Sequence, residues 1–433
     1  MKADQPATVL HARIQQANLS WDEAARLAVD AISKHENTSV SLTGRHLARL
    51  SRQERPGHRP TPIIRRALEL AFNESIDKLL LPVAESGVVH DASSSPTSRT
   101  LETLSMAADR ARHFRSFEMT SQEAVDTIRD DVSALALAYP TRPLDALLPD
   151  LVQAQDAVFG LLERPQRPTQ GADLYFLSGV VGGMLAKASH DQGNPTAALS
   201  QTRTAWLCAE HSGHDGLRAW IRGLQSLISY WAGQPRESVR YAESGSEYAL
   251  RAGNSSLAWL PASEARAWAR LGNSERAQAA IQRANAAWTE VRADELDELG
   301  GIANFTEARQ VYFAAEALSW LPGEDQATAE YANQAVERYS DSTRPEWAFG
   351  DAAGSRAALA ISRIEQGDEA GAAETMRGVL DLPAGQRING IIHSVRRVHE
   401  VISRQESIGA TGRDLQDEIE DYTRLSLPRL PRN

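Results

Sequence analysis

The chain has 433 residues, of which 42% are hydrophobic and 24% are charged, and these ordinary proportions exclude collagen-like, fully disordered and membrane-protein classes. No apolar run reaches the roughly 18 residues that a membrane span needs, and residues 1–6 lack the apolar stretch of a secretory signal. Because Cys208 is the only cysteine, no disulfide can form within the chain, and we expect a protein of the reducing cytoplasm.

The net charge of -11 is unevenly distributed. Residues 1–82 carry 12 Lys and Arg against 9 Asp and Glu, whereas the rest of the chain carries 34 against 48. An acidic surface repels nucleic acid, so only the N-terminal segment has a charge that suits nucleic-acid binding.

Residues 1–82 are predicted to form a small helical domain. Four helices are expected there: over residues 8–17, from Trp21 onward, over residues 43–50 and over residues 63–72. Ser20 and Glu23 have the spacing of a capping box, which predicts the start of the second helix. Leu47 and Leu50 are three residues apart and predict the inner face of the third helix, with its arginines on the outer face.

Arginine is concentrated at the end of this domain. Between Val40 and Arg66 there is a single acid, Glu54, and the arginines are Arg45, Arg49, Arg52, Arg55, Arg59, Arg65 and Arg66. Guanidinium groups displace counterions from phosphates and read guanine edges in DNA. By itself, such a run is equally compatible with a solvated face or with a face that pairs with another protein.

Residues 83–100 are polar and rich in serine, which predicts a flexible linker. From residue 101 to 425, leucines and alanines recur at three- and four-residue spacings, and the alternation typical of strands is absent. The first helices of this part are expected over residues 101–117, 121–138 and 144–162. The predicted fold class is therefore all-α, with a disordered tail over residues 426–433.

Five glycines recur through this long part at intervals of 40, 39, 51 and 44 residues. They are Gly193, Gly233, Gly272, Gly323 and Gly367. Small residues stand seven positions before and five positions after most of them, as Ala265 and Ala277 do around Gly272. Small side chains let two antiparallel helices approach closely, and glycine supplies the positive φ of a tight turn. The pattern predicts a superhelical array of helix hairpins, although an alanine-rich helical bundle is the alternative.

The order of these elements resembles a known class of bacterial regulators. The Leu-Ser opening of the second helix, the basic third helix, the Arg59-Pro-Thr-Pro62 turn and the closing helix resemble the helix-turn-helix domain of the lambda-repressor/Cro (XRE) class, over roughly residues 7–80. The glycine and small-residue spacing resembles the tetratricopeptide repeat, more diffusely, over residues 101–425. One departure is the long connection over residues 29–39, where the class has a tight turn.

The resemblance implies that the third helix enters the major groove of double-stranded DNA. The DNA contacts that it implies are Thr43, Arg45, His46, Arg49, Arg52, Arg55 and Arg59. It further implies a homodimer, because two heads on one symmetry axis read two half-sites. The implied function is a cytoplasmic transcriptional regulator, on the nucleoid when bound to DNA, whose repeat body dimerises and senses a ligand. The alternative is a protein-interaction scaffold with a vestigial head.

Tryptophan is concentrated in the repeat body. The eight positions are Trp206, Trp220, Trp231, Trp259, Trp268, Trp288, Trp320 and Trp347. Most are expected to pack between stacked hairpins, while some would line a concave groove for a peptide, a small molecule or a protein. Arg218, Arg222 and Gln225 are the polar candidates for this groove, with a solvated helix face as the alternative.

No catalytic, metal or cofactor site is expected. Cys208, His211 and His214 have a metal-like spacing, but no second cluster completes a site. The acidic run at residues 294–298 lacks the spacing of a calcium loop and is expected to be a solvated helix face. Because no nucleophile elbow and no phosphate loop occurs, we expect neither an enzyme nor a bound cofactor.

Overall fold

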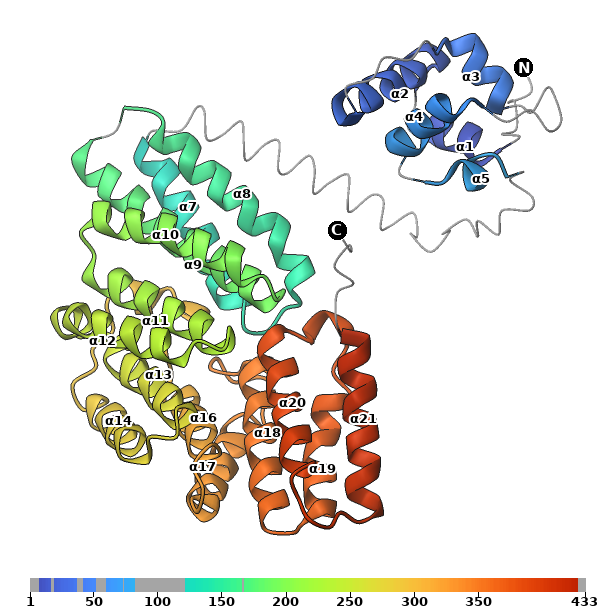
Figure 1. The fold of residues 1–433 in the computed structure, drawn as a ribbon. Helices are drawn as coiled ribbons and strands as arrows, with labels where there is room; N and C mark the ends of the chain where they lie inside the picture. Colours follow the sequence, from blue (N-terminus) through green and yellow to red (C-terminus); the bar gives the residue numbers. More distant parts are fainter. Residues whose placement is uncertain are drawn as a thin grey trace. The chain divides into compact units, whose positions relative to one another are not determined.

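The computed structural model describes residues 8–16, 19–36, 42–51, 60–72, 74–81, 121–165 and 167–426. The chain divides into two compact units, Met1–Ala111 and Arg112–Asn433, whose described parts are called the head and the body below. The all-α fold class is confirmed: the described residues form helices joined by turns, packed in the body as consecutive hairpins (Figure 1). The expected linker, the helix expected over residues 101–117 and residues 427–433 lie outside the described residues.

The helices described in the head are α1 (Val9–Gln16), α2 (Trp21–Glu36), α3 (Gly44–Ser51), α4 (Pro62–Phe72) and α5 (Ile76–Leu79). The predicted capping box is present at the start of α2, where the Ser20 N–H donates to Glu23 Oε2 at 2.8 Å and the Glu23 N–H donates to Ser20 Oγ at 3.3 Å. These bonds satisfy amides that the first helical turn leaves without partners. The helix then runs for 16 residues, so most of the unusual connection before α3 is a longer second helix.

The head has its own apolar core. Leu10, Leu47 and Leu68 are completely buried and come from α1, α3 and α4. Two hydrogen bonds join the start of α1 to other parts of the head. The Thr8 hydroxyl donates to the Ser51 carbonyl at the end of α3, at 2.6 Å, and the Val9 N–H donates to the Leu81 carbonyl after α5, at 3.1 Å. The first and last described segments of the head are therefore in direct contact.

The body helices follow one another as hairpins (Figure 1). They are α7 (Ser121–Ala138), α8 (Leu144–Leu162), α9 (Pro168–Asp191), α10 (Pro195–Ser212), α11 (Asp215–Trp231), α12 (Pro235–Ala252), α13 (Ser256–Arg270), α14 (Ser274–Ala287), α15 (Glu295–Glu298), α16 (Glu307–Leu318), α17 (Asp325–Arg338), α18 (Phe349–Glu365), α19 (Glu369–Leu380), α20 (Asn389–Ile402) and α21 (Ala410–Ser426), with short 3-10 turns at η1 (Gly301–Ala303) and η2 (Ala384–Gln386). The helices predicted over residues 121–138 and 144–162 coincide with α7 and α8.

The recurring glycines end helices as predicted. All five have a positive φ, between 73° and 81°, which an L-residue adopts only with strain. After three of these glycines, the next residue caps the following helix: Asn194, Asn273 and Asp368 each accept a backbone N–H three residues on, at 2.9 to 3.0 Å. In these three places a Gly-Asn or Gly-Asp dipeptide ends one helix and caps the next.

The small residues around these glycines let the paired helices touch. Ala265 of α13 and Ala277 of α14 are buried in one cluster. Ser226 of α11 donates to the Ser238 carbonyl of α12 at 2.9 Å, in the corresponding place of its hairpin. The predicted role of the small residues is therefore confirmed in these hairpins.

The array curves until its early and late hairpins meet. The Phe349 N–H at the start of α18 donates to the Pro140 carbonyl after α7, at 3.2 Å. Trp231 of α11 stacks on His393 of α20, with ring centroids 5.7 Å apart. Because α9 also contacts α20, the inward faces of several helices surround a common interior.

Residues 288–306 form an inner strap that connects α14 to α16 and includes α15 and η1. Leu296, Ile302 and Phe305 of the strap are buried in the largest core cluster of the body. The Trp220 indole of α11 donates to the Ile302 carbonyl at 3.3 Å. The expectation of a solvated helix face at residues 294–298 is therefore wrong for Leu296 and Asp297, which are both buried. The strap therefore lies inside the curved array, where its apolar residues are part of the core.

Candidate functional site

Helix α3 presents a basic outer face in the head. Leu47 and Leu50 are buried, whereas Arg45 and Arg49 are exposed and lie one helical turn apart. His46 lies between them in sequence and is half-buried. Its N–H is 3.3 Å from the Thr43 hydroxyl oxygen, which accepts it as the N-cap of α3.

Close packing against α2 holds α3 in place. Gly44 is buried at the start of α3, and a Cβ there would lie 2.7 Å from the Asp22 backbone nitrogen. Only glycine lets the two backbones approach this closely. Within the part of the head that the structure describes, no carboxylate pairs with Arg45 or Arg49. Arg52, Arg55 and Arg59, the other three implied contacts, lie outside the described residues.

An interior cavity of about 110 Å³ lies in the body. Its walls come from α9, α11, α13, α16, α18 and α20, the α7–α8 turn and the inner strap. Aromatic rings supply much of the apolar wall: Tyr139, Trp220, Trp231, Trp259, Phe305, Tyr312, Phe313 and Phe349. Such a concave, mostly apolar space with a few polar groups is typical of a small-molecule site.

Charged side chains in the cavity wall occur in pairs. Arg309 Nε lies 2.7 Å from Asp351 Oδ2, and Lys187 Nζ lies 2.6 Å from Asp191 Oδ2. Burial, reinforced by nearby cations, lowers the pKa of His190 well below its usual range, so this ring is neutral at pH 7. Arg309 and Lys187 therefore each already have a carboxylate partner.

Arg266 of α13 is the most deeply placed cation of the wall. Its side chain is 3% exposed, and its Nε lies 2.8 Å from Glu316 Oε2 of α16. The guanidinium carbon lies 4.1 Å from the ring centroid of Phe313 and 4.3 Å from that of Tyr230. Burial alone would lower the pKa of Arg266, but Glu316 and the nearby tyrosines outweigh burial and raise it, so Arg266 stays charged.

Arg266 Nε has its ion-pair contact with Glu316, and two further buried donors of the wall have no acceptor among the described residues. They are Nη2 of Arg266 and the indole Nε1 of Trp259. Both residues line the cavity. A buried N–H without an acceptor costs about 1 to 3 kcal/mol, so these two donors mark where a ligand oxygen would be stabilised.

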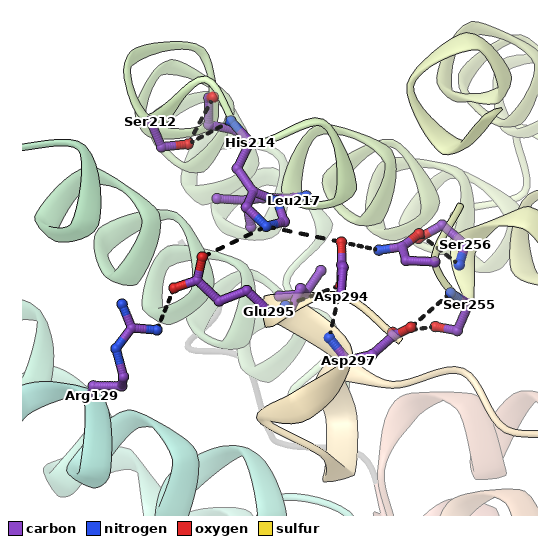
Figure 2. Close-up of polar contacts among 12 residues, drawn as sticks. Arg129, Ser212, His214, Leu217, Ser255, Ser256, Asp294, Glu295 and Asp297 are labelled. Atoms are coloured by element: carbon purple, nitrogen blue, oxygen red, sulfur yellow. Dashed lines mark hydrogen bonds and ion pairs between the residues drawn. The ribbon is translucent and has the colours of Figure 1, made fainter. Parts of the chain in front are cut away.

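The inner strap closes one side of the cavity and is held by a polar network (Figure 2). Asp294 caps α15 by accepting the Leu296 and Asp297 N–H groups, each at 3.0 Å. His214 of α11 lies between Asp294 and Glu295, with Nε2 3.9 Å and 4.0 Å from their oxygens. Arg129 of α7 pairs with Glu295 from the other side. Glu295 thus pairs the strap with α7, and the His214 ring at the start of α11 lies beside both carboxylates.

Asp297 fastens the strap to α13. Its Oδ2 accepts the Ser255 N–H at 2.8 Å and its Oδ1 accepts the Ser255 hydroxyl at 2.6 Å. The same hydroxyl oxygen accepts the Phe305 N–H at 3.0 Å. Burial, with a smaller contribution from the Asp294 charge, raises the pKa of Asp297 to about 6 despite the bonds from Ser255.

The raised pKa of Asp297 predicts a pH dependence. Since the folded protein holds this proton more tightly than the unfolded chain, the stability from Asp297 is greatest below about pH 4 and falls until about pH 6. We expect wild type to lose stability relative to an Asp297→Asn variant over that interval, with a constant difference at higher pH. Urea unfolding of both proteins at pH 4, 5, 6 and 7 checks this, and a difference that does not change with pH would contradict it.

The three residues proposed for a groove lie on another face of α11. Residues of α11 that line the cavity are Trp220, Leu224, Leu227 and Trp231. Arg218 pairs with Glu210 and Asp215. Arg222 lies over the Trp206 ring at 3.7 Å and donates to the buried Gln225. Arg218 and Arg222 thus contact α10, Gln225 accepts from Arg222, and none of the three lines the interior cavity.

The Cys208, His211 and His214 triplet takes up ordinary packing roles. Cys208 is buried, His211 stacks on Tyr175, and His214 Nδ1 accepts the Leu217 N–H at 3.0 Å as the N-cap of α11. Among the described residues, no group of three His, Cys, Asp or Glu side chains is arranged to hold a metal ion. Sequence reasoning did not single out the cavity residues Arg266, Arg309 and Asp351.

No family model matches the chain, and no curated protein matches it significantly. None of the helices in the described ranges is long and apolar enough to cross a membrane.

Proposed function

We propose that the chain is a DNA-binding transcriptional regulator whose head contacts a promoter through α3 and whose body binds a ligand in the interior cavity. The observation that carries the first part is the outer face of α3. Arg45 and Arg49 are exposed there on a helix without acidic residues, while Leu47 and Leu50 anchor the helix in the head core. An amphipathic helix with this distribution presents guanidinium groups to a DNA groove.

The proposal for the body rests on the cavity. Its walls come from helices far apart in the sequence and from the inner strap. A ligand that contacts all of these walls would favour one arrangement of the hairpins over others, which is a population shift. The proposed regulator works as a homodimer in the cytoplasm, because paired heads place two α3 helices on successive half-sites of double-stranded DNA.

The test is fluorescence anisotropy of labelled duplex from the gene's own upstream region, titrated across a salt series. The Arg45→Ala/Arg49→Ala variant should lose about a hundredfold in affinity, from roughly 1 to 3 kcal/mol for each contact, and its salt dependence should fall by about two counterions. Its folding should be unchanged because both side chains are exposed. Two chains should bind each duplex at saturation.

The matched control is Arg240→Ala/Arg377→Ala, which removes two charges from exposed sites of the body. Among the described residues, each of these arginines pairs with an acid of its own helix. This control should bind the duplex as the wild type does. Unchanged affinity of the α3 variant would overturn the assignment of α3. Failure of the wild type to bind any upstream or genomic duplex above competitor would favour the alternative, a repeat scaffold with a vestigial head.

A further inference from the structure

We propose that the interior cavity of the body binds an uncharged, ring-bearing molecule with a carbonyl oxygen, which accepts hydrogen bonds from Trp259 Nε1 and Arg266 Nη2. The regulatory meaning of this ligand rests on the proposed function, whereas its binding to the body does not.

The walls are suited to an apolar ring. Trp259 and Phe305 stack with centroids 6.0 Å apart and an interplanar angle of 16°, and Phe313 meets Phe305 edge to face at 5.4 Å. Trp220 and Tyr312 complete this group, and each is at least 95% buried. The cavity volume of about 110 Å³ is of the same order as the roughly 150 Å³ of an apolar cavity that binds benzene. A ring can therefore pack among these side chains.

The donors specify what the ring must carry. Trp259 is 6% exposed and Arg266 is 2% exposed, and neither Nε1 of the first nor Nη2 of the second has an acceptor among the described residues. Both side chains line the cavity from α13. Since the two groups can only donate, the complementary ligand group is an acceptor oxygen.

The charges of the site favour an uncharged ligand. Arg266, Arg309 and Lys187 each have a carboxylate partner, at 2.8 Å, 2.7 Å and 2.6 Å, and His190 is neutral because burial lowers its pKa. An anionic ligand would enter a buried space whose positive charges are already compensated, and its desolvation would be unfavourable. A neutral carbonyl oxygen accepts a hydrogen bond from such a donor without that cost.

Three benzene derivatives of similar size test the inference by calorimetry on the full chain. They are acetophenone, which has a carbonyl, cumene, which has no acceptor, and benzoate, which is charged. Acetophenone should bind about fivefold to tenfold more tightly than cumene, as expected for one or two hydrogen bonds, and more tightly than benzoate. Trp259→Phe keeps an aromatic ring but removes the Nε1 donor, so the preference for acetophenone over cumene should fall about fivefold.

Trp206→Phe is the control for the same chemical change, because Trp206 packs under Arg222 and does not line the cavity. It should bind all three compounds as the wild type does. Equal affinities for acetophenone and cumene, tighter binding of benzoate, an unchanged Trp259→Phe variant, or no binding of acetophenone would each overturn the inference. The Arg45→Ala/Arg49→Ala variant should still bind acetophenone, so a failure of the DNA proposal is distinguishable from a failure of this one.

Discussion

Replacing Arg266 with methionine should destabilise the body by about 3 to 5 kcal/mol, because it leaves the buried Glu316 carboxylate without its cation. The two side chains are 3% and 10% exposed, and Nε lies 2.8 Å from Oε2. Glu316 also accepts the Tyr230 hydroxyl at 2.8 Å, but this neutral donor cannot replace a positive charge. Urea unfolding followed by circular dichroism measures the change.

A second variant separates the unpaired charge from a general loss of packing. In Arg266→Met/Glu316→Gln the amide oxygen can still accept from Tyr230, and neither side chain of the pair is charged, so the double variant should recover much of the lost stability. Arg377→Met breaks a surface pair whose side chains are 68% and 66% exposed and should change stability by less than about 1 kcal/mol. The interpretation would be wrong if the double variant were no more stable than Arg266→Met.

Gly301→Ala should release the inner strap and lower the free energy of unfolding by about 3 kcal/mol or more. Gly301 has a φ of 55°, and a Cβ there would lie 2.0 Å from the Ala136 carbonyl oxygen of α7. An L-residue at positive φ costs roughly 1 to 2 kcal/mol, and overlap with a backbone atom adds roughly 1 to 3 kcal/mol. Because backbone cannot move aside as a flexible side chain does, the strap has to shift.

Gly323 offers a matched control for the backbone strain. Its φ is 81°, and a Cβ there would meet nothing within 4 Å. Gly323→Ala should therefore show only the strain at positive φ, about 1 to 2 kcal/mol, and the difference between the variants measures the contact with α7. Urea unfolding and protease cleavage within residues 288–306 provide the readouts. Equal losses for both variants, with an intact strap, would contradict the close approach of the strap to α7.

Local patterns in the sequence predict much of the fold. The five turn glycines and the capping box of Ser20 and Glu23 are found as expected, because each depends on residues a few positions apart. The outer face of α3 follows from the spacing of Leu47 and Leu50 in the same way. Spacing along one helix is enough to identify its buried face once the helix is known.

The same rule explains which residues of α11 lie together. At 100° per residue, Arg218, Arg222 and Gln225 share one face of the helix, whereas Trp220 and Leu224 share the opposite one. Their spacing therefore groups each set correctly. It does not tell which face turns toward the interior, since that depends on which hairpins lie on either side.

The sequence by itself determined the all-α fold class, the turn glycines and the capping box, because these depend on local spacing and composition. Only the tertiary structure decided where the cavity lies, since curvature brings Tyr139 and Ser394 to the same walls. It also decided that an acidic connection turns inward, because Asp297 finds Ser255, a partner 42 residues away. Contacts over such separations depend on how successive hairpins are rotated against each other, and no local pattern encodes that rotation.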